Sequence, residues 1–314
     1  MEKKNRLNYW KNRYGDRYDG WRVRNLDAVF AAIPFFLRTR IDAQNYFEER
    51  VPIDHLEQFI RDHKEDIPDL SIMHIVMAAL VRLYSQRPHL NRFVVWNKIY
   101  ARNHVNIALV IKRSMKDDGE ETLIKPYFLP TDTIKDVVGK VKAELDANQH
   151  EGQENSSDKV SKLFRMLPPW LVRFAVWALL NMDKVGIMPK IIFKASPWHS
   201  GIFITNIGSI GVESIYHHLY EFGTCSMFVA MGKKSRRHNF NREGKLAEYK
   251  SILLKFVMDE RVCDGYYYAS SMRLLNKILS DPATLLTPPE NVVLDDGVDR
   301  KPEPKETWFN TTSI

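Results

Sequence analysis

The sequence has few cysteines and lacks the segments that carry a chain into or across a membrane. Its 314 residues include only two cysteines, Cys225 and Cys263, too few for a disulfide framework or a structural zinc site. The first residues, MEKKNRLNYWKNR, are polar and contain no apolar core of a secretion signal. The apolar stretch from Trp170 to Met182 is shorter than the ~20 residues that span a bilayer, and it contains Arg173. We therefore expect a cytosolic protein.

Several common catalytic motifs are also absent from the sequence. There is no GxGxxG after a predicted strand, no GxxxxGK[ST], no HExxH, no CxxC and no GxSxG. These absences argue against a nucleotide-phosphate site, a zinc hydrolase and a serine hydrolase.

The excess positive charge is local rather than spread over the chain. Lys and Arg outnumber Asp and Glu by 46 to 39, which gives a net charge of +7. Residues 1–40 carry ten basic and four acidic side chains, and residues 161–195 carry six and one. Residues 281–314 carry seven acidic and three basic side chains. Two basic patches on a neutral body do not indicate nucleic-acid binding, so we expect no nucleic-acid partner.

The middle of the chain has the patterning of one large α/β domain. With 44% hydrophobic residues, the chain can build a sizeable core. Helical spacing of apolar residues predicts helices at 68–84, at 132–147 and from Gly265 to about Leu279. Apolar runs predict strands at 92–96, 104–111, 201–205, 225–232 and 251–258. The last two strands are expected to pair as a buried hairpin joined by a basic loop.

Three segments lie outside this pattern. Residues 1–40, basic and aromatic, are interpreted as an arm that wraps over a surface, and residues 283–314, acidic and rich in proline, as a poorly ordered tail. Residues 148–199 are interpreted as an insertion into a domain that spans 41–282. Within the insertion, residues 163–193 include a segment that is apolar on nearly all sides and must be buried against something. Burial in the core, in a subunit contact or in a membrane interface remains open.

The sequence FVMDERVCDGYYYASSMRLLNKILSDP (256–282) carries a buried strand through a tight turn into a helix. Asp264 lies at the start of this helix, where a carboxylate caps free N–H groups and meets the positive end of the helix dipole. The local interpretation is a helix cap, with Asp259 and Glu260 facing solvent. A magnesium site formed by these three acids is an alternative, weakened because neighbouring strand residues point to opposite faces.

The turn DERVCDG (259–265) followed by a helix resembles the active-site signature of the 2-oxoacid dehydrogenase acyltransferase catalytic domain and its relative chloramphenicol acetyltransferase, in which a His and three further residues precede Asp-Gly. FITNIGSIG (203–211) resembles the family's strand and Ser-Asn-(Leu/Ile)-Gly turn. ERVPIDHLEQFI (49–60) and the helix and strands in 70–111 resemble the elements that open its catalytic domain. The resemblance implies an α/β two-layer sandwich with a mixed β-sheet, similar to chloramphenicol acetyltransferase.

The resemblance also implies a function. It predicts a homotrimer with acyl-transfer sites between subunits, where coenzyme A and a small acceptor meet and where no metal ion is expected. It places Thr205 at the hydroxyl that stabilises the oxyanion, a contribution of ~2–4 kcal/mol in the transition state, and Asp264 at the acid that holds the loop. Glu260 occupies the position of the catalytic His, which is the general base. The expected reaction is acyl transfer from a coenzyme A thioester, with Glu260 in place of the usual His.

A glutamate at the base position leaves three interpretations open. A free glutamate, with a pKa of ~4.3, is a poor base for a thiol with a pKa of ~8.5, unless an apolar channel raises its pKa. Either Glu260 is the working base, or His217 or His218 replaces it, or catalysis is lost. In the last case the chain is a non-catalytic trimeric binding or scaffold protein of the same fold. Each histidine, taken singly, also fits an ordinary surface or core position.

Two further features are secondary candidates. Cys263 is interpreted as a buried structural thiol rather than a nucleophile, because the adjacent acids raise the pKa of a thiol. The basic run KKSRRH (233–238) is interpreted as a solvated turn, with binding of the coenzyme A phosphates as the alternative. Nothing before the predicted domain is long enough to be a lipoyl domain or a subunit-binding domain, so we expect a stand-alone enzyme without a lipoyl group.

Overall fold

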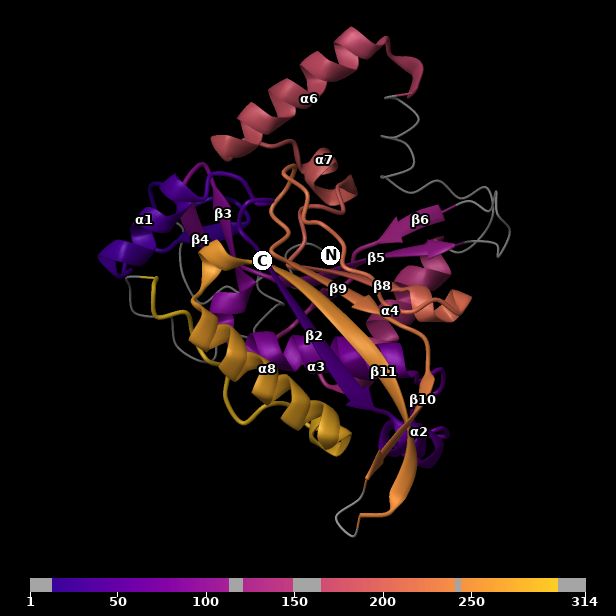
Figure 1. The fold of residues 1–314 in the computed structure, drawn as a ribbon. Helices are drawn as coiled ribbons and strands as arrows, with labels where there is room; N and C mark the ends of the chain where they lie inside the picture. Colours follow the sequence, from indigo (N-terminus) through magenta and orange to yellow (C-terminus); the bar gives the residue numbers. More distant parts are fainter. Residues whose placement is uncertain (1–12, 113–120, 149–164, 241–243, 299–314) are drawn as a thin grey trace.

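A mixed β-sheet forms the centre of the protein (Figure 1). The computed structural model describes residues 13–112, 121–148, 165–240 and 244–298. Strands β5, β8 and β9 are parallel to one another, and the other pairs in this sheet are antiparallel. Its eight strands are β2 (Gln44–Pro52), β5 (Val105–Lys112), β6 (Glu121–Ile124), β7 (Tyr127–Phe128), β8 (Ile202–Asn206), β9 (Met227–Met231), β10 (Ser235–Phe240) and β11 (Leu246–Asp259). The predicted mixed sheet is confirmed.

Helices cover one face of this sheet and enclose the main core. They are α2 (Asp54–Asp62), α3 (Ile72–Gln86), α4 (Ile134–Asn148) and α8 (Gly265–Ser280). Helix α3 is buried along almost its whole length between α4, α8 and the sheet. It begins after Ser71, whose hydroxyl caps the helix, rather than at the predicted Pro68. The layered α/β architecture agrees with the predicted fold class.

The other face of the sheet has only a thin cover. Phe203, Phe228 and Val257 form a small apolar cluster there with Leu219, which lies in the segment after β8. The rings of Phe203 and Phe228 stack with their centroids 4.7 Å apart. In the described part of the chain, no helix packs on this cluster.

The N-terminal region is more deeply built into the protein than the predicted arm. Strand β1 (Gly20–Arg22) joins β4 (Lys98–Arg102) and β3 (Arg92–Val95) in a small antiparallel sheet. Trp21 lies in the main core and is only 1% exposed. Helix α1 (Ala28–Phe36) follows. The interpretation of residues 1–40 as a wrapping arm is therefore wrong for this part, because β1 and Trp21 belong to the packed body; residues 1–12 lie outside the described residues.

The predicted disorder of the C-terminal tail is wrong as far as residue 298. The short helix η4 (Pro282–Leu285) buries Leu285, and Asp295 forms a buried ion pair with Arg92 at 2.6 Å. The carbonyl of Gly297 accepts hydrogen bonds from the backbone N–H groups of Arg24 and Asn25. These contacts fix the segment against the small sheet, although its sequence is acidic and rich in proline. Residues 299–314 lie outside the described part.

The predicted pairing of strands 225–232 and 251–258 is confirmed as β9 with β11, but their connection is not a simple loop. Residues 235–240 form β10, which pairs with the first half of β11. Lys234 binds Glu57 at 2.7 Å, and Arg236 binds Glu248 at 3.2 Å. The basic run is therefore mainly an exposed strand with partly paired charges, which corrects its interpretation as a turn.

The insertion contains α6 (Pro169–Lys184) and α7 (Lys190–Ala195), and α6 stands away from the body at the top of Figure 1. Asp183 is the only buried residue of α6. Of the three alternatives that the sequence left open, burial in the core of the single chain is therefore not found for α6 in the described residues. None of the helices in the described residues is long and apolar enough to cross a membrane.

Buried polar groups fix the base of the insertion to the body. Asp183 accepts a hydrogen bond from Arg17 at 2.7 Å, and Arg17 also pairs with the buried Asp19. The Lys125 ammonium donates to the carbonyl oxygens of Phe193 and Ser196 at 2.8 and 2.9 Å, at the end of α7. These contacts hold the last turn of α6 and the end of α7, while the rest of α6 extends outside the body.

His199 makes this junction sensitive to pH. It is fully buried, with 3.6 Å between its Nε2 and the carboxylate of Asp183. Burial lowers the pKa of His199 below its usual 6.5. Burial alone disfavours a charged Asp183, but His199 and Arg17 outweigh this and lower the pKa of Asp183 to about 2. Because of both shifts, the unfolded chain binds more protons in acid than the folded chain does. The free energy of unfolding therefore decreases as the pH is lowered.

We expect the free energy of unfolding to decrease below pH 6.5, with His199 contributing up to about 1.4 kcal/mol per pH unit until its lowered pKa is reached. The Asp183 contribution is lost separately, between about pH 4 and 2. Urea unfolding at pH 7.5, 6.5 and 5.5 measures the first effect. His199→Gln should flatten the pH dependence, whereas His218→Gln, at an exposed position, should leave it unchanged. An identical dependence in wild type and His199→Gln would contradict this assignment.

Candidate active site

The turn between β11 and α8 carries the candidate catalytic residues. Strand β11 ends at Asp259, a single 3-10 turn η3 (Glu260–Val262) follows, and α8 begins at Gly265. Asp264 caps α8, because its carboxylate accepts a hydrogen bond from the backbone N–H of Tyr267 at 2.7 Å. The predicted helix cap is present, and Asp264 is exposed.

Asp259 fixes the turn from its buried side. Its side chain is completely buried, and its two oxygens accept hydrogen bonds from the Arg261 guanidinium at 2.8 and 2.7 Å. Arg40 approaches the same carboxylate at 3.6 Å, and the Tyr268 hydroxyl donates to the Asp259 carbonyl. The interpretation of Asp259 as a solvent-facing acid is therefore wrong. With both of its oxygens engaged by guanidinium groups, the magnesium site proposed from Asp259, Glu260 and Asp264 has no support either.

Glu260 is placed by its backbone and leaves its side chain in solvent. Its N–H donates to the carbonyl of Ala43 at 2.8 Å, which fixes the turn against the residue before β2. The side chain is exposed in the single chain. A carboxylate acts as a base for a thiol or hydroxyl only when its surroundings are desolvated. The single chain does not provide such surroundings for Glu260.

Thr205 lies far from Glu260 along the sheet. The register pairs Thr205 of β8 with Ala230 of β9 and Ala230 with Lys255 of β11. Glu260 follows Lys255 by five residues, which corresponds to about 16 Å along a strand. One chain therefore does not bring Thr205 and Glu260 together. A site that uses both residues has to combine two copies of the chain.

His217 lies on the same face of the sheet as Thr205. Its ring stacks on Phe228 with the centroids 4.4 Å apart, and Phe228 stacks on Phe203. Thr205 follows Phe203 by two residues, so strand alternation directs it to this same face. His217 is half-buried, and burial lowers its pKa. His218 is exposed and lies 4.7 Å from the Tyr220 ring.

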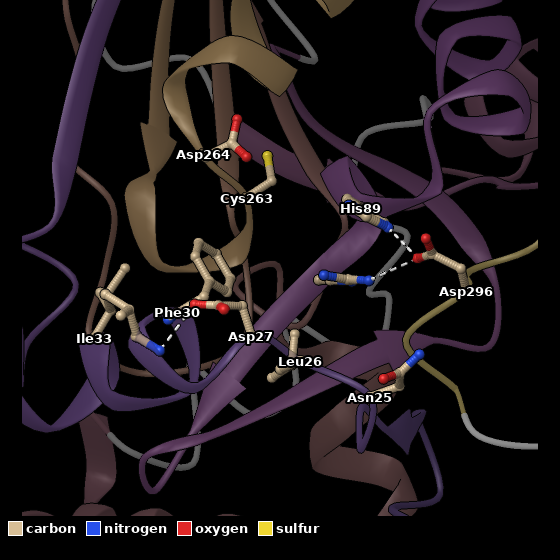
Figure 2. Close-up of a pocket in the computed structure, with 11 residues that line it drawn as sticks. Asn25, Leu26, Asp27, Phe30, Ile33, His89, Cys263, Asp264 and Asp296 are labelled. Carbon is tan, nitrogen blue, oxygen red and sulfur yellow. Dashed lines mark hydrogen bonds and ion pairs between the residues drawn. The ribbon is translucent and has the colours of Figure 1, made fainter.

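A surface cavity of about 430 Å³ opens beside the turn (Figure 2). Cys263 and Asp264 line one wall, Phe30 and Ile33 of α1 line another, and His89 lies across from them. Burial raises the pKa of the Cys263 thiol well above its usual range. A thiol held in its neutral form is a poor nucleophile, so Cys263 agrees with its interpretation as a structural residue.

Potential metal ligands also meet at this cavity. Atoms of His89, Asp295 and Asp296 lie within 4.8 Å of one another. Both oxygens of Asp295, however, bind the Arg92 guanidinium at 2.6 and 2.8 Å, and His89 binds Asp296 at 2.7 Å. The Arg92 guanidinium already pairs with Asp295 and also lies 3.5 Å from Asp296. The cluster therefore ties the C-terminal segment to β3 and is not a metal centre.

Sequence comparison identifies the region that contains both candidate residues. Residues 198–287 match the family model described as 2-oxoacid dehydrogenases acyltransferase (catalytic domain). This range runs from the residues before β8 to the end of η4 and includes Thr205, Glu260 and Asp264. The resemblance to this acyltransferase family is confirmed. Among curated proteins, none matches the sequence significantly.

Solved structures show the same fold well beyond that region. A probable dihydrolipoamide acetyltransferase from Listeria monocytogenes has a TM-score of 0.50 at 14% identity, over 86% of this chain and 97% of its own. The dihydrolipoamide acetyltransferase of Azotobacter vinelandii has a TM-score of 0.50 at 14% identity, over 82% of this chain and 88% of its own. A chloramphenicol acetyltransferase has a TM-score of 0.47 at 12% identity, over 78% of this chain and 92% of its own. At such identities the first two comparisons show the fold alone.

Proposed function

We propose that this protein is a stand-alone, coenzyme A-dependent acyltransferase that acts as a homotrimer, with residues 41–282 as its catalytic domain. The observation that carries the proposal is the family match over residues 198–287, which contains both Thr205 and the Glu260-to-Gly265 turn. A serine, a histidine and an asparagine were studied for their role in the catalytic mechanism of the Azotobacter enzyme, and the last two are spaced as Glu260 and Asp264 are.

The geometry favours a site shared between two subunits. Glu260 of one subunit removes the proton from the acceptor, and the acceptor attacks the thioester carbonyl carbon. The Thr205 hydroxyl of the neighbouring subunit donates a hydrogen bond to the resulting oxyanion. The tetrahedral intermediate then expels the coenzyme A thiolate, which takes the proton back from Glu260. The neighbouring subunit also supplies the desolvation that a carboxylate base requires.

A non-catalytic binding or scaffold protein is the second candidate. The exposure of Glu260 and its replacement of the family's His favour this alternative. Such a protein binds coenzyme A without turning over an acyl thioester.

One assay separates the two candidates. Purified protein is incubated with acetyl-coenzyme A and a panel of small thiols, alcohols and amines, and acylated acceptor is measured by mass spectrometry. The proposal expects product that falls strongly in Thr205→Ala and Glu260→Ala but not in His218→Ala. Equal product from wild type and both site variants would remove the proposal. Calorimetric binding of coenzyme A without product would favour the second candidate.

A further inference from the structure

Helix α6 exposes a row of aromatic side chains. Trp170, Phe174 and Trp177 are 70%, 59% and 61% exposed. Their spacing places them within about 60° of one another around the helix axis. The rings of Phe174 and Trp177 stack at 5.8 Å, which gathers them into one surface. A contiguous exposed apolar row of this kind marks an interaction surface.

Positive charge borders this aromatic row, and acidic side chains are absent from it. Arg173 and Lys184 lie within about 60° of Trp170 around the helix, and both are exposed. Lys190 and Lys194 extend the positive charge onto the exposed side of α7. The one acid between residues 165 and 195, Asp183, is buried and paired with Arg17. The outward charge of these residues is therefore entirely basic.

The helix is presented as a fixed element rather than a loose end. Arg17 holds Asp183 through both its side chain and its backbone carbonyl, and Lys125 holds the last carbonyls of α7. Exposed apolar residues next to this attachment, Ile187 at 63% and Ile191 at 64%, extend the surface. The buried polar attachment and the apolar exterior together set α6 out from the body, as Figure 1 shows.

We propose that α6 is an interfacial membrane helix that docks this protein on bilayers containing anionic lipid. Trp and Phe side chains insert at the headgroup level, while Arg173 and Lys184 meet lipid phosphates at the margin. The 16 residues of α6 extend about 24 Å, which is less than the ~30 Å hydrocarbon core, so the helix lies along the surface. This inference goes beyond acyl transfer and does not depend on it.

A bilayer fits this surface better than a second α6 helix does. If two α6 helices packed on each other, their identical basic margins would meet and repel, because a two-fold contact pairs a surface with itself. An anionic bilayer instead offers negative charge over the whole length of the row.

The test is flotation with lipid vesicles. Wild-type protein is mixed with vesicles of phosphatidylcholine alone or with 30% phosphatidylserine, at low and high salt. We expect flotation only with the anionic vesicles, reduced by high salt. The triple aromatic variant, Trp170→Ser/Phe174→Ser/Trp177→Ser, should have a partition coefficient on the anionic vesicles at least tenfold lower than that of the wild type. The charge-reversal variant, Arg173→Glu/Lys184→Glu, should reduce the partition coefficient by more than about 25-fold. Each basic residue near an anionic surface strengthens binding about fivefold, and this variant removes two of them.

Phe240→Ser/Leu246→Ser removes two equally exposed apolar residues from the distant hairpin and serves as the matched control. It should float as wild type does. Thermal unfolding and circular dichroism establish that all variants are folded. No flotation of wild type, or equal flotation of the wild type and the aromatic variant, overturns the proposal. A smaller assembly of the aromatic variant in sedimentation velocity, without any lipid effect, also overturns it and assigns the surface to a second copy.

Discussion

Replacing Asp259 by alanine is expected to lower the free energy of unfolding by about 3–5 kcal/mol, the usual cost of breaking a buried ion pair. The change leaves the buried guanidinium groups of Arg261 and Arg40 without their carboxylate partner. An unpaired buried charge is far more costly than the lost attraction between exposed charges. The turn that carries Glu260 would lose the group that fixes it.

Urea unfolding monitored by circular dichroism measures the effect. Asp264→Ala is the matched control: it removes the acid that the family resemblance names as structural, but here that acid is an exposed helix cap. It should cost only about 1 kcal/mol. A larger loss in Asp264→Ala than in Asp259→Ala would show that the family's assignment holds and that the buried cluster does not maintain the turn.

Replacing Glu260 by glutamine is expected to reduce kcat by about 10²–10⁴-fold, the usual contribution of a general base. Glutamine keeps the size of the side chain and one acceptor oxygen but cannot take up the proton. Because Glu260 is exposed and its backbone makes the contact with Ala43, the fold should be unaffected. Steady-state kinetics with the acceptor found in the panel assay measure the change.

Two further variants make this result specific. Glu260→His restores the residue that the family resemblance predicts and should recover activity relative to Glu260→Gln. Thr205→Ser keeps the hydroxyl and should stay active, whereas Thr205→Ala should lose about 10²–10³-fold in kcat. If Glu260→Gln were fully active and His217→Gln inactive, the base would be His217, which lies on the same sheet face as Thr205.

The sequence predicted the elements around the site well because their signals are local. Asp264 and Gly265 marked the start of α8, and the apolar runs marked β9 and β11. The inward side of α8 is harder to read from spacing alone, because Tyr268 is buried whereas the neighbouring Ala269 is exposed. The Tyr268 hydroxyl is satisfied there by the Asp259 carbonyl.

The role of Asp259 could not be predicted because its partners are set by tertiary structure. Arg40 comes from a segment more than two hundred residues earlier in the chain. The spacing of Asp259 and Arg261 was the available signal, but two charged residues near a turn are more often exposed. Asp295 was missed for the same reason, since Arg92 lies far from it in the sequence.

For α6 the sequence could not decide between the core, a subunit contact and a membrane interface. Apolar residues on nearly every side predict burial, and in water that inference is sound. Within the described residues, Asp183 is the one residue of this helix that is buried. Its apolar side chains are therefore not covered by the described part of the core.

The most direct test of a site shared between subunits is complementation between two inactive variants. Glu260→Ala and Thr205→Ala chains, each inactive alone, are co-expressed with different tags and purified as mixed trimers. Each mixed trimer has one interface in three at which an intact Glu260 faces an intact Thr205, so about a third of wild-type activity should return. Mixed trimers with no more activity than the two separate variants would contradict the account.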